Sequence, residues 1–311
     1  MSPSRAAADE RPLAFLLPQG GQGEPAPATE TPRLKSAASE IKRARELLAK
    51  QSSISAKIVE TVTIYDRSYK AEGRYLQNSL KSDDWYMRLE LALKVGDSEG
   101  SLLEVCDGDV LWTSTQIGAA RKGSKKDKDK KEHTVTRRNV KDILNAARKL
   151  GEQTETMLIT DLGLGGMPGL LASIERDMRF TGVKEEVFRD RPVLLIQGTW
   201  SDAFALRLQG QQRGGSGLLP PFVPDSTRIY LDRETGFPHR ILYLKKIPGR
   251  DVQKPMLTLD FLDVVINQPI DPTEFVYEPP SNPAPLELTN TYLQQLAPPD
   301  SKSGPGTKGP R

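Results

Sequence analysis

The feature that most constrains this chain is a run of alternating apolar residues that begins at Trp85. The apolar positions are Trp85, Met87, Leu89, Leu91 and Leu93, and mostly polar residues lie between them. Such alternation is typical of a strand with one buried and one solvated face. A second apolar run, 102–106, leads into Asp107-Gly108, a dipeptide suited to a tight turn, and 110–112 leaves it and ends on Trp112. The stretch therefore predicts an antiparallel sheet early in the chain.

Similar patterns predict strands along the rest of the chain. These are expected at 57–65, 71–80, from 183 onward, 193–200, 203–209, 228–232, 240–245, 256–265 and 274–277. Helical spacing predicts three helices, at 34–48, 139–150 and 170–178. About ten strands joined mostly by short turns indicate an α+β fold. A sheet of that size has to curl, so we expect a large curved antiparallel sheet, an unclosed half-barrel, with helices packed on its concave face.

Composition divides the chain into three parts. Residues 1–33 form a Pro/Ala/Gly-rich segment that we expect to be a disordered tail, and residues 281–311 form a second one, rich in Pro, Ser and Gly. The domain itself is expected at 34–280. Within it, the lysine-rich block 121–131 is typical of a solvated loop, although contact with an anionic surface is an alternative.

Charge and residue counts argue against several classes of function. The net charge is only +3, from 44 basic and 41 acidic residues, so nothing drives the chain toward nucleic acid. The single cysteine, Cys106, excludes an internal disulfide and a thiolate metal cluster. His133 and His239 are far apart in the sequence, and we expect both at the surface. With no catalytic constellation, we expect a protein that is not an enzyme and holds no metal or cofactor.

Two other segments bear on function. The loop Gly163-x-Gly165 before a helix is similar to a phosphate cradle, but it stands alone among antiparallel strands, and we interpret it as the flexible start of a short helix. No apolar run approaches the roughly 18 to 20 residues of a membrane span. The first residues show no secretory leader, which leaves open a cytoplasmic protein or a mature chain whose leader was removed.

The order of several short motifs is similar to that of a known family. The motifs are Ala71-Glu72-Gly73-Arg74-Tyr75, Trp85-Tyr86-Met87-Arg88-Leu89, Asp107-Gly108-Asp109-Val110-Leu111-Trp112, Tyr230-Leu231-Asp232 with Thr235-Gly236-Phe237-Pro238-His239-Arg240-Ile241, and Asn267-Gln268-Pro269-Ile270-Asp271-Pro272-Thr273-Glu274-Phe275. Over residues 36–280 this succession resembles the LolA-like outer-membrane lipoprotein-sorting family and the wider superfamily of lipoprotein and lipid carriers. The usual Arg-Pro pair between the second and third strands is replaced here by Lys81-Ser82-Asp83-Asp84.

The resemblance implies an unclosed antiparallel barrel with helices over a hydrophobic cavity, in a non-catalytic periplasmic or cell-envelope carrier. It also implies lipid or lipoprotein acyl chains as ligand, and membrane donor and acceptor proteins as partners. We expect a monomer that does not bind nucleic acid. The expected cavity lining is Trp85, Met87, Leu89, Leu91 and Trp112 on the sheet, with Ile41 and Leu48 on the covering helix. A one-residue slip would exchange the two faces. The alternative is that the helices fill the concavity, which would favour an envelope scaffold or sensor that binds a protein partner.

Overall fold

The structure is a computed structural model. It describes residues 36–64, 67–78, 85–95, 98–118, 131–210, 223–247, 249–250 and 252–297. The expected N-terminal tail, most of the lysine-rich block and residues 298–311 lie outside the described residues.

The described residues form one large sheet that is not closed. Its strands are β1 (Ser53–Ile64), β2 (Arg67–Asn78), β3 (Trp85–Val95), β4 (Ser98–Gly108), β5 (Val110–Gly118), β6 (Lys131–Asn139), β7 (Met178–Phe188), β8 (Arg191–Trp200), β9 (Ser226–Asp232), β10 (Pro238–Lys246), β11 (Gln253–Ile266) and β12 (Leu286–Glu287). The strand order is β12-β6-β5-β4-β3-β2-β1-β11-β10-β9-β8-β7, so β12 and β7 are the two edges. Every neighbouring pair is antiparallel except β12 with β6.

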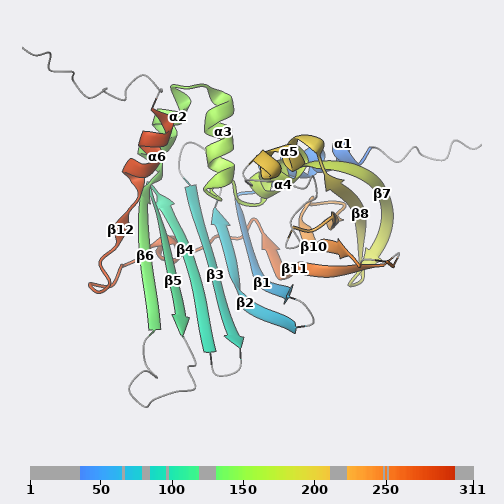
Figure 1. Cartoon of the computed structure of the whole chain (residues 1–311), viewed down its shortest axis with the longest axis horizontal. Coiled ribbons are helices and arrows are strands. Elements are labelled where there is room, and N and C mark those ends of the chain that lie inside the picture. The colour runs from blue at the N-terminus through green and yellow to red at the C-terminus, as the bar shows by residue number, and fades with distance from the viewer. Residues whose placement is uncertain are drawn as a thin grey trace, which may run out of the picture. The chain divides into compact units, whose positions relative to one another are not determined.

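The helices gather at one end of the sheet, which is the top in Figure 1. They are α1 (Ala37–Leu48), α2 (Val140–Arg148), α3 (Glu152–Asp161), α4 (Gly166–Asp177), α5 (Asp202–Gly210) and α6 (Thr289–Leu296), with a 3-10 turn η1 (Pro272–Phe275). The opposite ends of β2–β5, which carry the β3–β4 hairpin, have no helix over them (Figure 1). The α+β half-barrel expected from the sequence is confirmed, with more strands and helices than the pattern predicted.

Local sequence explains where two of the helices begin. The Ser36 hydroxyl accepts a hydrogen bond from the Ser39 N–H, at 3.2 Å, and so caps α1. Asn139 caps α2 in the same way, accepting from the Asp142 N–H at 3.0 Å, as its position in the sequence predicted. Each cap satisfies a backbone donor that the first helical turn would leave unpaired.

Two segments expected to be strands are not. Residues 203–209 belong to helix α5, which begins after Ser201, whose hydroxyl accepts from the Phe204 N–H at 3.2 Å. Serine at this position favours a helix start over a strand, and the apolar spacing alone did not reveal it. Residues 274–277 include the end of η1 and pair with no strand. Beyond residue 280, where a disordered tail was expected, the chain forms β12 and α6.

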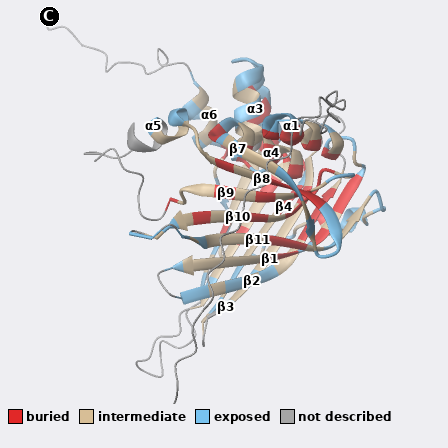
Figure 2. Ribbon diagram, turned by 90° about the vertical axis from the view of Figure 1, so that its right-hand side faces the viewer, coloured by how far each residue is buried: buried red, intermediate tan, exposed pale blue. Residues whose placement is uncertain are grey.

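The core lies between the helices and the strands near them. Side chains from α1, α2 and four strands are fully buried there: Ile41, Leu48, Ile143, Ile54, Ile196, Ile229 and Ile241. Figure 2 shows buried residues concentrated at the helix-covered end, and mostly intermediate or exposed residues toward the free ends of β1–β3. Burial therefore decreases toward the free strand ends, and part of the inner sheet face there is not covered by the core.

Residues 274–277 lie against the outer face of the sheet. There Phe275 is buried with its ring 5.7 Å from that of Tyr86, and Tyr277 lies 5.6 Å from Trp112. The Arg88 guanidinium donates to the Glu274 carbonyl at 2.7 Å. Contacts of this kind occupy the outer face of β3 and β5.

Candidate functional site

The strand register decides which side chains share the inner face. Leu89 lies opposite Tyr75 of β2 and Glu104 of β4, and Leu91 lies opposite Gly73 and Leu102. Because side chains alternate along a strand, Met87, Leu89 and Leu91 all point to the same side as Tyr75 and Glu104. This is the side on which α4 lies, so the alternation along β3 places these three residues together beneath α4.

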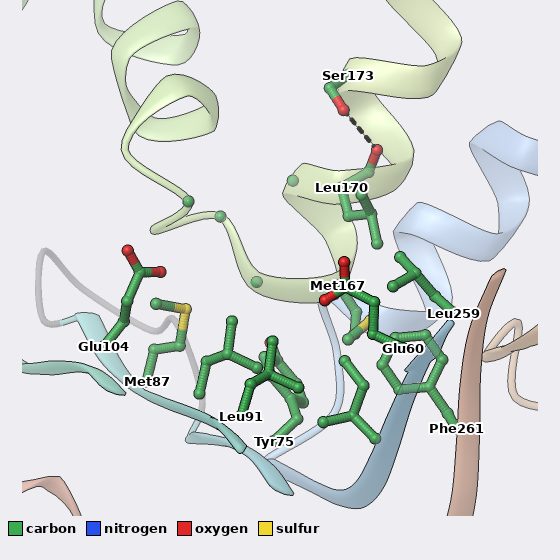
Figure 3. Close-up of a pocket in the computed structure, with 16 residues that line it drawn as sticks. Glu60, Tyr75, Met87, Leu91, Glu104, Met167, Leu170, Ser173, Leu259 and Phe261 are labelled. Carbon is green, nitrogen blue, oxygen red and sulfur yellow. Dashed lines mark hydrogen bonds between the residues drawn. The ribbon is translucent and has the colours of Figure 1, made fainter. Parts of the chain in front are cut away.

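A first cavity of about 280 Å³ lies between this face and the start of α4 (Figure 3). Strands β1, β2, β3, β4 and β11 form its floor, and the loop before α4 and the first turns of α4 form its roof. The lining residues are Ile58, Glu60, Tyr75, Met87, Leu89, Leu91, Glu104, Gly163, Gly165, Gly166, Met167, Gly169, Leu170, Ser173, Leu259 and Phe261. Most of this surface is carbon, and the Ser173 hydroxyl is already satisfied by the Leu170 carbonyl at 2.8 Å.

A second cavity of about 410 Å³ continues along the same sheet face toward the hairpin ends. Its lining residues are Glu60, Val62, Ile64, Tyr69, Ala71, Leu91, Leu93, Gly100, Ser101, Leu102, Thr115, Gln116 and Ile117. Glu60 and Leu91 line both cavities, so the two adjoin. We call the two cavities together the groove. It runs from beneath α4 to the uncovered end of the sheet, where Ile64 and Ile117 are exposed at its rim.

Polar groups of β2 hold the roof in place. The Gln77 side-chain oxygen accepts hydrogen bonds from the Tyr75 hydroxyl and from the Met167 N–H, the latter at 3.0 Å. Gly166 has φ +54°, and a Cβ there would lie 2.0 Å from the same Gln77 oxygen. Only glycine fits both the backbone conformation and the space. The glycine loop that the sequence interpretation treated as a flexible helix start is thus fixed to the sheet at this point.

Two carboxylates lie in this apolar surface. Burial raises the pKa of Glu104, and the positive charge of Arg138 and a hydrogen bond from the Thr113 hydroxyl, at 3.4 Å, only partly offset that effect. Burial also raises the pKa of Glu60. No other charged residue among those the structure describes lines either cavity. The groove can therefore accept an apolar chain along its length and a hydrogen-bond donor or cation at these two points.

The structure brings together some of the residues expected to line a cavity and separates others. Met87, Leu89 and Leu91 line the groove. Trp85 lies on the same strand face but borders a neighbouring hollow beside α1 and α3, with Lys42, Arg45 and Ile159.

The other three expected residues do not line the groove. Ile41 and Leu48 are fully buried in the filled core. Trp112 lies on the outer face, because its cross-strand partner is Val105 rather than Cys106. Cys106 pairs with Leu111, so the inner face of β5 carries residues 111, 113 and 115. Trp85 and Trp112 were both expected on the inner face, but the register at the Asp107-Gly108 turn places them on opposite faces.

Several groove residues were missed from the sequence. Tyr69, Tyr75, Leu259 and Phe261 come from strands whose pairing was not predicted residue by residue. Glu60 had a visible signal, since Ile58, Glu60 and Val62 take alternate positions and so share a face. A carboxylate between apolar residues on one strand face predicts a polar group on an otherwise apolar surface, and this signal could have identified Glu60.

Other candidate chemistry is limited in the part of the chain that the structure describes. No group of three or more His, Cys, Asp or Glu residues there could hold a metal ion. No helix among the same residues has the length and apolar character needed to cross a membrane. Burial raises the pKa of the Cys106 thiol to about 12, so it is not a reactive thiolate at neutral pH. His239, expected at the surface, is buried beside Asp232 with Nε2 3.2 Å from Oδ2.

Comparisons with known proteins give similarities to solved structures at low TM-scores. No protein-family model matches the sequence, and a search of curated proteins found no match. MucB of Pseudomonas aeruginosa, solved in complex with MucA, is 16% identical at a TM-score of 0.37, over 78% of this chain and 61% of that one. The chain thus spans about three fifths of the MucB chain it matches.

Two further solved structures match most of their own length. A putative outer membrane lipoprotein-sorting protein domain from Vibrio parahaemolyticus is 10% identical at a TM-score of 0.24, over 77% of this chain and 97% of that one. Lipoprotein LppX of Mycobacterium tuberculosis is 9% identical at a TM-score of 0.30, over 76% and 97%.

Proposed function

We propose that this protein is a non-catalytic carrier of the cell envelope, and that it binds an acyl chain of a lipid or lipoprotein in the groove. The observation that carries the proposal is the continuous apolar surface from Met87 to Ile117, beneath α4 and out to the hairpin ends. Its two cavities, about 280 and 410 Å³, together lie within the size range of small-molecule sites. Each buried methylene contributes about 0.8 kcal/mol, so a long chain binds without specific polar contacts.

A second candidate is an envelope scaffold or sensor of the same fold that binds a protein partner. The filled core under α1, where Ile41 and Leu48 leave no space, favours this reading for that part of the sheet. The open groove supports the carrier, because a scaffold has no need of an open apolar channel next to its core.

Native mass spectrometry of the purified full chain, followed by organic extraction and lipid analysis, tests the carrier proposal. We expect co-purified mass in the lipid range that is lost on extraction. We also expect the extracted protein to take up a neutral fluorescent apolar dye. A clean apo mass together with no uptake of the dye would favour the scaffold.

The variant Leu91→Asn tests whether binding occurs in the groove. Leu91 lines both cavities, so an amide at this point removes apolar contact and places a polar group against the chain. We expect dye affinity to fall at least about tenfold, which is about 1.4 kcal/mol.

The matched control is Ala92→Asn, next in sequence but exposed on the outer face of β3. It introduces the same side chain into the same strand and should bind like the parent protein. Circular dichroism of both variants shows whether the sheet is intact, and equal affinities in two folded variants would argue against the groove as the binding site.

A further inference from the structure

The point where the two cavities join carries an acidic side chain. Glu60 lies on the inner face of β1, between Ile58 and Val62, and opposite Ala71 of β2 and Leu259 of β11. Figure 3 shows Glu60 above the floor of the groove near Met167 and Leu259, with Glu104 at the far side beyond Met87. A ligand that lies along the groove therefore passes Glu60.

The two carboxylates differ in what surrounds them. Glu104 accepts a hydrogen bond from Thr113, and Thr113 in turn accepts one from the Arg138 guanidinium at 2.9 Å. Among the described residues, the Glu60 side chain has no hydrogen bond or ion pair. No Lys, Arg or His in the described part of the chain lines either cavity. Within that part, Glu60 is the acidic group of the groove that has no partner.

An unpaired carboxylate on an apolar surface loses hydration and gains nothing from its neighbours. A ligand cation would supply the missing partner through a charge-assisted hydrogen bond. A ligand carboxylate would instead be placed beside a like charge and be repelled. On this ground the charge of the head group would decide how tightly an amphiphile binds in the groove.

Resting on the proposed function, we infer that the groove selects amphiphiles whose head group is a protonated amine, which binds at Glu60 while the apolar chain lies along the groove. The Glu60 carboxylate accepts the hydrogen bond, and the chain contacts residues such as Leu91 and Leu102. An anionic amphiphile with the same chain binds more weakly.

Displacement of a neutral fluorescent dye from the full chain tests the inference at a fixed neutral pH. The competitors are dodecylamine, dodecanol and dodecanoate, each below its micellar concentration. In the parent protein we expect dodecylamine to bind at least about tenfold more tightly than dodecanoate. In Glu60→Gln we expect this ratio to fall close to one, while dodecanol affinity stays within about twofold of the parent.

The matched control is Glu72→Gln, which removes a carboxylate from the exposed outer face of β2, close to Glu60 in the sheet. It should keep the preference for dodecylamine. Thermal unfolding of both variants verifies that they fold.

The outcomes separate this inference from the proposal on which it rests. If the dye and dodecanol bind but dodecylamine and dodecanoate do so equally, the inference is overturned and the carrier proposal stands. A preference that survives in Glu60→Gln and disappears in Glu104→Gln also overturns it. If none of these compounds binds the extracted protein, both the inference and the carrier proposal fail.

Discussion

At the scale of single residues, the best-defined electrostatic arrangement lies outside the groove, in the turn between β9 and β10. The Asp232 carboxylate accepts hydrogen bonds from the N–H groups of Glu234 and Thr235, both at 2.9 Å, and lies 3.2 Å from His239 Nε2. Burial alone would raise the pKa of Asp232, but these hydrogen bonds outweigh it and hold the pKa well below its usual range. The stability of this turn therefore depends on the ionisation of Asp232, and so on pH.

The variant Asp232→Asn tests this link. Because the folded-state pKa is depressed, the carboxylate stabilises the fold above its unfolded pKa of about 3.9, and this stabilisation is lost as the pH falls toward the folded value. We expect the variant to be about 1–3 kcal/mol less stable than the parent at pH 7, with the gap narrowing below about pH 4. Urea unfolding across this pH range measures the gap.

The control for this experiment is Glu234→Gln, which removes an exposed carboxylate from the same turn. It should leave stability at pH 7 within about 0.5 kcal/mol of the parent. A gap for Asp232→Asn that stays constant from pH 7 to pH 3 would show that the loss comes from packing rather than from the charge.

The sequence predicted correctly which face a side chain occupies where the pattern of a single strand is enough. It failed where the face depends on how two strands pair. Alternation alone places Met87, Leu89 and Leu91 on one face, and the structure agrees. Placing Trp112 required the register across the Asp107-Gly108 turn, and a shift of one residue there reverses the face. The burial of His239 depends on its pairing with Asp232, seven residues away across a turn, which composition does not reveal.

At the scale of elements, the sequence patterns predicted β1–β5, β7–β11 and the helices α1, α2 and α4. They missed β6 and α3. They also missed α5, where one serine cap decides between helix and strand, and α6, which lies beyond a proline-rich segment. Such elements were missed partly because local propensity does not show which segments pair with another strand or pack on a helix. The edge strand β12 illustrates this, since its two residues are defined by pairing with β6 alone.

The start of α4 gives a prediction at this scale. In Gly166→Ala the positive φ is unfavourable for alanine by about 1–2 kcal/mol, and the added Cβ would also meet the Gln77 side-chain oxygen. We expect a loss of stability of at least about 1 kcal/mol in urea unfolding, together with weaker dye binding, because the roof of the first cavity is displaced.

The control within the same helix is Gly169→Ala. A Cβ at residue 169 has nothing within 4 Å, and alanine favours helix over glycine by up to about 1 kcal/mol. This variant should be as stable as the parent or more so. If both substitutions destabilise the protein equally, Gly166 is needed for the helix itself and not for its contact with Gln77.

At the scale of the whole described sheet, one fold contains two different interiors. Near α1 the inner face is closed by a packed core, with Phe237 and Phe261 stacked edge to face at 5.5 Å. Toward the β3–β4 hairpin the same face is open and forms the groove. A close-packed interior has no room for a ligand, while the groove leaves apolar surface in contact with water. A ligand should therefore stabilise one part of the sheet and leave the other unchanged.

Hydrogen–deuterium exchange of the delipidated full chain tests this division. With saturating dodecanol we expect slower exchange in peptides from β1, from β4 and from the start of α4, because ligand binding disfavours local opening of the elements it contacts. Peptides from β8 and β9, which contribute Ile196 and Ile229 to the packed core, serve as the internal control and should exchange at unchanged rates. The Leu91→Asn variant should lose the protection under the same conditions. Uniform slowing across β1, β8 and β9 would instead indicate global stabilisation and contradict a ligand site confined to the groove.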